Sequence, residues 1–379
     1  MYKEEIMKNL YSPLITRHSS LYLHVPFCLS KCGYCAFYSI VPSQDLKNKY
    51  FEKLAADFEN EAEKLGSFKT IFVGGGNPTA LGEKGAAKFV ELFQRLDLSE
   101  TAEITFESNP ETLSEEVLNI LCSLKKLRIS MGIQRLSDDE LTILDRKARM
   151  KNVLKAAEML SEKKINFSCD FILGVPFCAS IADSLKMFIG EFNPNHISAY
   201  MLSVEEGTPL CEKVRTGEFP HDSTVGTEEY FQVRDLLISE GYTHYEISNF
   251  AKNGFESLHN LNYWLCGDYL GLGPAAVSTK GNIRRSFPDD FETWLKGEEE
   301  IEELSEKDKF NEFVMLALRL IRGLDITELK HRFGEIPQEF YNGLEKNLNQ
   351  GLLVENAERV RLTDKGLTFV DQAIAELFL

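Results

Sequence analysis

The chain has 379 residues, of which 43% are hydrophobic and 27% charged, a composition typical of a globular protein and not of a disordered or fibrous one. Its 42 Lys and Arg against 59 Asp and Glu give a formal charge of −17, which argues against non-specific nucleic-acid binding, because that depends on cationic side chains. No run approaches the roughly 18 apolar residues that cross a bilayer, and the N-terminus lacks the apolar stretch of a signal peptide. We therefore expect a cytoplasmic protein with no transmembrane segment.

Six short runs rich in β-branched and aromatic residues alternate with longer segments of helical period. The predicted strands cover residues 21–25, 70–73, 103–106, 128–133, 167–173 and 196–201. The predicted helices cover residues 45–64, 83–95, 114–123, 138–162, 182–191 and 228–240. Such alternation implies parallel strands joined by right-handed crossovers. The sequence thus predicts an α/β fold with a partial (β/α)6 barrel, whose active residues lie at the C-terminal strand ends.

The pattern changes after the sixth unit. Residues 243–295, rich in Gly, Tyr and Asn, are predicted to form an irregular extension, and residues 296–309 an acidic linker with little structure of its own. Three helices (309–321, 326–333 and 338–350), two strands (352–354 and 360–362) and a final helix then resemble a winged helix. The predicted domains are the barrel (1–242), the extension (243–295) and the linker with its winged-helix-like α+β domain (296–379). Because residues 304–379 hold 10 Lys and Arg against 13 Asp and Glu, packing or partner docking is expected there, and not DNA binding.

Three of the eight cysteines form a C-x3-C-x2-C pattern directly after the first strand, at Cys28, Cys32 and Cys35. Three thiolates on one loop can ligate three irons of a [4Fe–4S] cluster and leave the fourth iron open to a small molecule. The alternatives are a zinc site or three packed cysteines. Zinc would need a fourth ligand, and His24 lies on the preceding strand, away from ligand spacing. The pattern therefore favours the cluster.

This motif, with an aromatic residue before its last cysteine, resembles that of the radical S-adenosylmethionine (SAM) superfamily. The glycine motif GGGNP at residues 74–78 ends the second strand, as it does in that superfamily, where the missing Cβ atoms let the backbone approach the amino group of the cofactor. Segments such as LYLHVPFC, ITFESNPET, DFILGVP and YEISNFAKNGFESLHNLNYWLCGDYLGLGPAA resemble the coproporphyrinogen dehydrogenase-like branch, which includes the HemW-type heme chaperones. The resemblance covers essentially the whole chain.

The resemblance implies a SAM site made of residues near the cysteine motif and at successive strand ends or just beyond them. Its members would be Tyr22, Tyr34, Gly75, Gly76, Asn77, Glu107, Gln134, Arg146 and Asp170. Taken singly, each polar residue could equally make an ordinary strand-end hydrogen bond or salt bridge. Asn77 departs from the threonine common in the family, and Ala148 stands where a histidine often follows the arginine.

Two functions from different classes remain open within this branch. An oxygen-independent coproporphyrinogen III oxidase would oxidise propionates, whereas a heme chaperone would bind heme and pass it to an acceptor protein. The oxidases carry a fourth cysteine two residues after the third, where this chain has Phe37. The segment HNLNYW matches the H-N-x-x-Y-W motif of the chaperones, which implies heme contacts by His259, Tyr263 and Trp264. The alternative is that His259 bonds a loop while the two aromatic residues pack.

The implied cofactors are therefore a [4Fe–4S] cluster, SAM and heme. The implied partners are heme, an unidentified heme-acceptor protein and an electron donor, and the sequence leaves open whether a radical reaction occurs in turnover. A radical enzyme that modifies nucleic acid is the weakest reading, because the C-terminal region is acidic.

Overall fold

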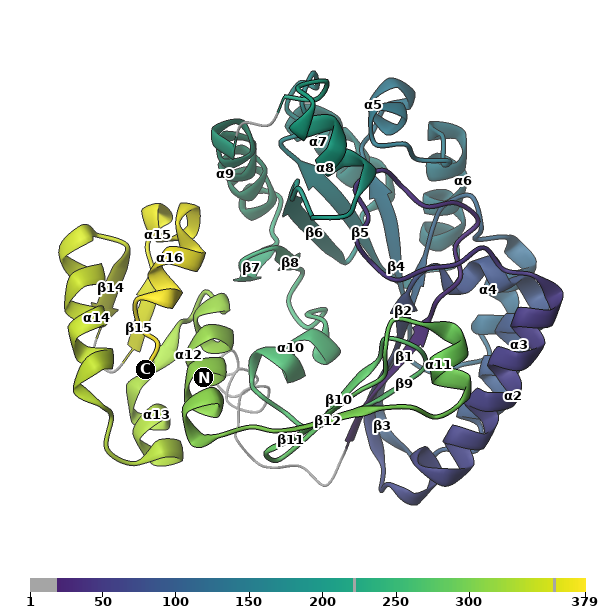
Figure 1. The fold of residues 1–379 in the computed structure, drawn as a ribbon. Coiled ribbons are helices and arrows are strands. Elements are labelled where there is room, and N and C mark those ends of the chain that lie inside the picture. Colours follow the sequence, from purple (N-terminus) through teal and green to yellow (C-terminus); the bar gives the residue numbers. More distant parts are fainter. Residues whose placement is uncertain (1–18, 221–222, 357–358) are drawn as a thin grey trace.

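The computed structural model describes residues 19–220, 223–356 and 359–379, so the first 18 residues of the predicted barrel domain lie outside the described residues. The centre of the protein is a parallel sheet (Figure 1). Its six strands are β1 (Ser19–Val25), β2 (Phe68–Gly75), β3 (Leu98–Ser108), β4 (Leu127–Gln134), β5 (Asn166–Leu173) and β6 (His196–Met201). They pair in chain order, which confirms the predicted α/β partial barrel.

Helices cover the outer face of this sheet (Figure 1). They are α2 (Gln44–Asn60), α3 (Gly82–Phe93), α4 (Glu115–Leu121), α5 (Asp138–Ile143), α6 (Met150–Glu162), α7 (Ala182–Phe192), α8 (Pro209–Arg215) and α9 (Ser223–Ser239), with the short 3₁₀ turns η1 (Ala62–Lys64) and η2 (Pro78–Leu81). The apolar faces of α2, α3, α4, α6, α7 and α9 and the outward side chains of the strands form one large core, in which Leu23, Val73, Ile129 and Phe171 are fully buried. Leu210 of α8 belongs to a separate, smaller apolar cluster. Burial of these side chains is the main stabilising term of the barrel.

The single helix predicted over residues 138–162 is wrong, because the chain forms two helices there. Arg149 adopts an extended conformation (φ −127°) just before α6, and the carboxylate of Asp138 accepts a hydrogen bond from the amide of Met150 (2.7 Å). Residues 144–149 therefore leave the helical path between α5 and α6.

The extension over residues 243–295 is also not irregular, since it forms regular elements on both edges of the barrel sheet. They are β7 (Thr243–Glu246), β8 (Asn249–Ala251), α10 (Leu258–Trp264), β9 (Tyr269–Leu272), β10 (Val277–Lys280), β11 (Ile283–Ser286) and α11 (Phe291–Leu295). Strand β8 pairs with β6, while β9 runs parallel to β1. These strands have only three or four residues each, too few for a clear alternating pattern. In β9 a glycine is also required, because a Cβ at Gly271 would collide with the backbone of Val277.

The predicted acidic linker is structured as well. Strand β12 (Glu300–Glu303) pairs with β11 at the edge of the twelve-stranded sheet, and Ser305 caps helix α12 (Glu306–Arg319) through a capping box with Asp308. Arginines of β11 face this acidic segment, and Arg285 lies 3.6 Å from the Glu299 carboxylate. Opposite charges across adjacent strands therefore support pairing that the acidic sequence alone disfavours.

The C-terminal residues form a second, smaller unit beside the barrel (Figure 1). After α12 come β13 (Leu324–Asp325), α13 (Ile326–Phe333), α14 (Gln338–Gln350), β14 (Leu353–Asn356), β15 (Arg359–Leu362), α15 (Asp364–Thr368) and α16 (Val370–Ala375). Three helices followed by a hairpin is the expected winged-helix order, and the unit has its own apolar core around Val314, Leu329 and Phe340. The amide of Ile247 donates to the carbonyl of Arg319 (3.0 Å) and so ties this unit to the barrel edge.

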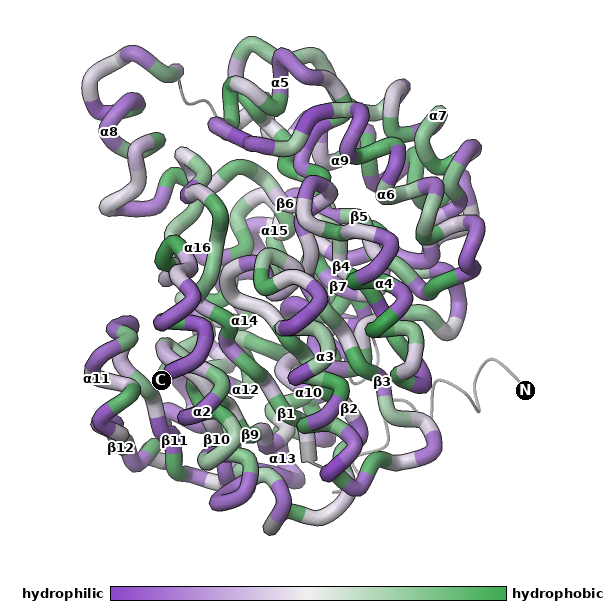
Figure 2. Tube along the Cα trace, turned by 90° about the vertical axis from the view of Figure 1, so that its right-hand side faces the viewer, coloured by the Kyte–Doolittle hydropathy of each residue, from purple (hydrophilic) through white to green (hydrophobic). Residues whose placement is uncertain are grey.

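Hydrophobic and hydrophilic stretches alternate along most of the chain (Figure 2). In the part of the chain that the structure describes, no helix has the length and apolar character needed to cross a membrane.

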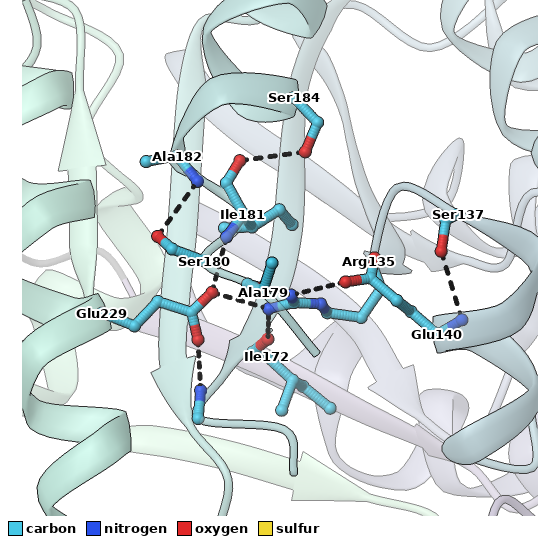
Figure 3. A network of polar contacts seen from close by, with 11 residues as sticks. Arg135, Ser137, Glu140, Ile172, Ala179, Ser180, Ile181, Ala182, Ser184 and Glu229 are labelled. Atoms are coloured by element: carbon cyan, nitrogen blue, oxygen red, sulfur yellow. Dashed lines mark hydrogen bonds and ion pairs between the residues drawn. The ribbon is translucent and has the colours of Figure 1, made fainter. Parts of the chain in front are cut away.

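A buried ion-pair network joins the loops at the C-terminal ends of β4 and β5 (Figure 3). The guanidinium of Arg135, which is fully buried, donates to the carboxylates of Glu229 and Glu140 (both 2.8 Å). The second oxygen of Glu229 accepts from the amide of Gly174 (2.5 Å), and the first also accepts from that of Ile181 (2.7 Å). Helix α9 therefore fixes the loop of residues 174–181.

We predict that Arg135→Ala lowers the free energy of unfolding by about 3–5 kcal/mol, because it leaves the buried Glu229 carboxylate without its charge partner. Urea denaturation measures the change. Arg215→Ala, which removes an exposed pair with Glu212, is the control and should leave the free energy of unfolding nearly unchanged, because exposed ion pairs contribute little. Equal losses in the two variants would contradict this account of the network.

Candidate cofactor site

The cysteine loop, defined as residues 26–43, leaves β1 at its C-terminal end and carries all three predicted cluster ligands. It closes on itself through the amide of Cys28, which donates to the carbonyl of Ile40 (3.1 Å), while the amide of Cys35 donates to the carbonyl of Cys32 (3.2 Å). All three thiols are free and partly buried. The fold thus places all three cysteines on one loop at the C-terminal end of β1, and their ligation of a cluster stays a prediction.

Ligation by these thiols would depend on their protonation. Among residues 19–220, 223–356 and 359–379, no three His, Cys, Asp or Glu side chains gather closely enough to hold one metal ion. Burial raises the pKa of the Cys28 thiol to about 11 and also raises the pKa of Cys35. Iron would have to replace these protons, since metal ligation requires thiolates.

Arg146 connects the cysteine loop to the ends of β3 and β4. Its guanidinium donates to the sulfur of Cys32 (3.4 Å), to the side-chain oxygen of Asn109 (3.0 Å) and to the carbonyl of Gly132 (2.6 Å). The side chain is 6% exposed, and it reaches this position because residues 144–149 leave the helical path. A buried cation beside a sulfur ligand stabilises negative charge there.

Two carboxylates line the interior of the barrel near this loop. Glu107 accepts a hydrogen bond from the amide of Gly75 (2.9 Å), and burial, with a smaller contribution from Asp170, raises its pKa to about 7. Asp170 accepts from the hydroxyls of Ser130 (3.1 Å) and Ser168 (3.3 Å), and burial raises its pKa as well. Both acids remain partly exposed, so they can accept hydrogen bonds from ribose hydroxyls or face a cationic centre.

The glycine motif is held against the root of the cysteine loop. The amides of Gly76 and Asn77 donate to the carbonyls of Val25 (2.9 Å) and Phe27 (2.8 Å). The Asn77 side chain is 2% exposed and its amide group bonds the hydroxyl of Thr112 (3.0 Å). Its side chain is therefore engaged within the protein, and only its backbone is left to border a cofactor.

Of the other predicted SAM residues, Tyr22 and Gln134 lie on barrel strands and Tyr34 lies on the cysteine loop. The hydroxyl of Tyr22 is 3.0 Å from Nδ1 of His24 inside the barrel, and Gln134 ends β4 with a φ of +75°. Tyr34 packs on a small apolar cluster above the ends of β5 and β6. The structure thus brings Cys32 and Arg146 into contact, and likewise Gly75 and Glu107.

The predicted heme ligand His259 lies in α10, against the N-terminal half of β2. Its Nδ1 is 2.8 Å from the hydroxyl of Thr70 and its Nε2 is 2.9 Å from the hydroxyl of Tyr263, and its ring stacks on Phe72 at 5.2 Å. The side chain is 1% exposed, and burial lowers its pKa to about 3, so the ring is neutral. Both ring nitrogens are therefore engaged, and the imidazole faces the barrel interior.

The other two predicted heme residues link α10 to its surroundings. Tyr263 packs edge-on against Tyr269 of β9 at 4.7 Å. The ring of Trp264 lies under the guanidinium of Arg319, 4.8 Å from its centre, and so contacts the C-terminal unit. The HNLNYW segment thus joins β9 to the C-terminal unit, and the ring of His259 also lies 6.4 Å from that of Tyr22 in β1.

Sequence reasoning missed Asn109, Thr112 and Arg128. Asn109 orients Arg146, and its place just past the third strand, within ITFESNPET, was the available signal. Arg128 is 2% exposed inside the barrel, where its charge helps to lower the pKa of His196 and His259. A cation at the first position of a predicted strand gave no signal.

The comparisons with known proteins agree with this geometry. The model of the radical SAM superfamily matches residues 22–177, and that of the HemN C-terminal domain matches residues 304–369. In the solved structure of coproporphyrinogen III oxidase (HemN) from Escherichia coli, the fold is the same, with a TM-score of 0.81 at 18% identity over 99% of this chain and 93% of that one. The barrel and the cysteine loop are those of a radical SAM protein.

Similar proteins of known name place the chain in one family within the radical SAM superfamily. Heme chaperone HemW from Haemophilus influenzae is 33% identical, covering 95% of this chain and 97% of the relative. The proteins of the same name from Lactococcus lactis and Escherichia coli are 30% and 32% identical, covering 97% and 95% of this chain and 99% and 98% of theirs. The chain belongs to the HemW family of radical SAM proteins.

The raised pKa of Glu107 predicts a pH-dependent stability. In the unfolded chain this carboxyl ionises near about pH 4.3, whereas in the folded protein it ionises near 7. Its contribution is thus fully present below about pH 4.3 and is lost as the pH rises through 7. Glu107→Gln should therefore stabilise the protein relative to the parent at pH 8 and not at pH 5, as measured by urea unfolding.

The control for this prediction is Glu116→Gln at the exposed start of α4. Hydrogen bonds at that helix start lower the pKa of Glu116, so its replacement should not reproduce the trend. If Glu107→Gln changed the free energy of unfolding by the same amount at pH 5 and at pH 8, the raised pKa of Glu107 would be refuted.

Proposed function

We propose that the protein is a heme chaperone of the radical SAM type, which binds heme and transfers it to an acceptor protein. The observation that carries the proposal is the similarity to HemW proteins along almost the full length of both chains, with 30–33% identity. Both the barrel and the C-terminal unit are covered by this similarity. The acceptor is a protein of unknown identity.

Cys28, Cys32 and Cys35 would hold the [4Fe–4S] cluster, with Arg146 beside Cys32. The backbone of Gly75, Gly76 and Asn77 and the side chains of the other predicted residues would border SAM. Together the two cofactors supply one-electron chemistry when bound. In this proposal Glu107 and Asp170 accept hydrogen bonds from SAM, and Arg146 fixes the cysteine loop relative to β3 and β4.

The assignment of heme to His259, Tyr263 and Trp264 stays a prediction, in which His259 would bind the iron. For His259 to bind iron, one ring nitrogen would have to give up its hydrogen bond with Thr70 or Tyr263. The neutral imidazole itself is chemically suited to iron.

The alternative is an oxygen-independent coproporphyrinogen III oxidase. The likeness to HemN supports a common fold and extends no further, because identity is 18%. Phe37 is exposed on the cysteine loop. It occupies the position at which the oxidases that the chain resembles carry a fourth cysteine, and this favours the chaperone. An electron donor for the cluster would be needed in both cases, and the proposed compartment is the reducing cytoplasm, where clustered thiols stay available to iron.

We predict that replacing any one of Cys28, Cys32 and Cys35 with Ala removes most of the broad visible absorption of the anaerobically reconstituted protein, since each cubane corner needs its thiolate. Iron and sulfide content measures the same loss independently. Cys122→Ala, at an exposed position, serves as the control and should keep the full absorption. Iron retention in the Cys32 variant would refute the assignment.

One incubation distinguishes the chaperone function from the oxidase function. With reduced cluster, SAM and coproporphyrinogen III, we expect no vinyl-containing product by chromatography, while the same preparation binds heme with a Soret shift. Multiple turnovers to a divinyl porphyrin would establish the oxidase instead. Absence of both product and heme binding would refute the chaperone proposal.

A further inference from the structure

Arg128 is a buried cation that has no hydrogen-bond partner among the described residues. Three arginines are buried in the described part of the chain, namely Arg128, Arg135 and Arg146. Arg135 and Arg146 each donate hydrogen bonds to side-chain and carbonyl oxygens. The guanidinium of Arg128 is 2% exposed, and its Nε is enclosed without a partner. Because an unpaired cation inside a protein is strongly unfavourable, a partner from outside the chain is needed there.

Arg128 points into the barrel at the same level as two polar neighbours. On β4 it stands between Leu127 and Ile129, which belong to the outer core, so by alternation its own side chain faces the interior. In the parallel register it lies between Thr105 of β3 and Asn166 of β5. Side chains in register share one face of a sheet, so these three residues line one level of the barrel interior.

Each of these three residues, which we call the polar row, has a buried polar atom without a hydrogen bond. The atoms are Oγ1 of Thr105, Nε of Arg128 and Oδ1 of Asn166, and the side chain of Thr105 is fully buried. Buried polar groups in folded proteins nearly always have partners. Three such atoms on adjacent strands therefore indicate a position where a molecule from outside the chain is bound.

The carboxylates inside the barrel do not serve as partners of Arg128. Burial raises the pKa of Glu103, Glu107 and Asp170, and the charge of Arg128 opposes the rise. The oxygens of these acids accept from backbone amides and from a serine hydroxyl, and none of them bonds Arg128 in the part of the chain that the structure describes. Because burial disfavours their ionised forms, they leave the polar row open to one further negative charge.

A singly charged carboxylate matches the chemistry of the polar row. A guanidinium donates two parallel hydrogen bonds to a carboxylate, the hydroxyl of Thr105 can donate a third, and the amide group of Asn166 can donate or accept. One negative charge balances one buried cation, whereas a doubly charged phosphate would leave an excess charge among the interior acids. Arg128 lies two residues before Ser130, the register partner of Glu107, which is roughly 7 Å along a strand. The ligand would thus lie one layer of side chains deeper than Glu107.

We propose that the polar row binds a small organic carboxylate inside the barrel, with Arg128 as its counter-ion and Thr105 and Asn166 as hydrogen-bond partners. The site is separate from the residues that are predicted to border SAM and from those predicted to contact heme. It therefore goes beyond the proposed chaperone function and does not depend on it.

The test uses acetate as the probe and follows its methyl group by saturation-transfer NMR, with the full-length reconstituted protein at saturating SAM. SAM, which would occupy the open iron, keeps acetate away from the cluster. We expect saturable binding by the parent. Arg128→Met should raise the Kd about tenfold or more, because it removes a charged hydrogen-bond donor. Thr105→Val keeps the shape of the side chain and the charge of the row, and should raise the Kd roughly threefold.

Matched controls are Arg215→Met on α8 and Thr142→Val on α5, both at exposed positions. Each should leave the Kd for acetate within about twofold of the parent, because substitutions at exposed positions have small effects. If Arg128→Met does not fold, the comparison of Thr105→Val with Thr142→Val decides the question.

Three results would overturn the proposal. Equal acetate binding by the parent and by the variants of the polar row would show that acetate binds elsewhere. Binding by the parent only when SAM is omitted would assign Arg128 to the carboxylate of SAM. A parent that binds no acetate would leave ordered water as the partner of Arg128. Heme binding, followed separately at the Soret band, tests the chaperone function, so failure of the carboxylate site leaves that function standing.

Discussion

Two backbone hydrogen bonds fasten the end of β2 to the root of the cysteine loop, from the amides of Gly76 and Asn77 to the carbonyls of Val25 and Phe27. They require a close approach that only glycine allows, because a Cβ on Gly76 would lie 2.7 Å from the Val25 carbonyl oxygen. A Cβ on Gly74 would likewise lie 2.6 Å from the Glu107 carboxylate. The glycine motif is thus needed first for the protein's own packing, and the position of the cysteine loop, Arg146 and Glu107 depends on it.

The parallel barrel could be predicted because each of its strands is a buried apolar run long enough to be seen, as at Phe171 and Leu173 in β5. The three cysteines could be predicted because spacing along one loop is a local property. The two helices α5 and α6 could not, since the break depends on a side chain, Asp138, which bonds a backbone amide twelve residues away. The strands at the sheet edges were missed for a related reason, because β9 becomes a strand only by pairing with β1.

The candidate site shows the same division. Glu107, near the end of β3, and Asp170, within β5, are implied by the family resemblance, whereas the engaged state of Asn77 depends on Thr112, which lies on another loop. His259 is a second example. A histidine within a family motif suggests a metal ligand, and the sequence does not show which groups surround it. Only its three-dimensional neighbours, Thr70 and Tyr263, reveal that both ring nitrogens already have partners.

Two groups of barrel residues therefore have different roles. At the C-terminal ends of the strands, the cysteine loop and the buried charges of Arg146 and Glu107 form a site suited to a redox cofactor. Helix α10 packs on β2 through His259 and joins the barrel to the C-terminal unit through Trp264 and Arg319. The most direct test of this account is the EPR spectrum of the reduced, reconstituted protein with and without SAM. We predict that SAM changes the spectrum by binding the open iron, and an identical spectrum at saturating SAM would contradict the account.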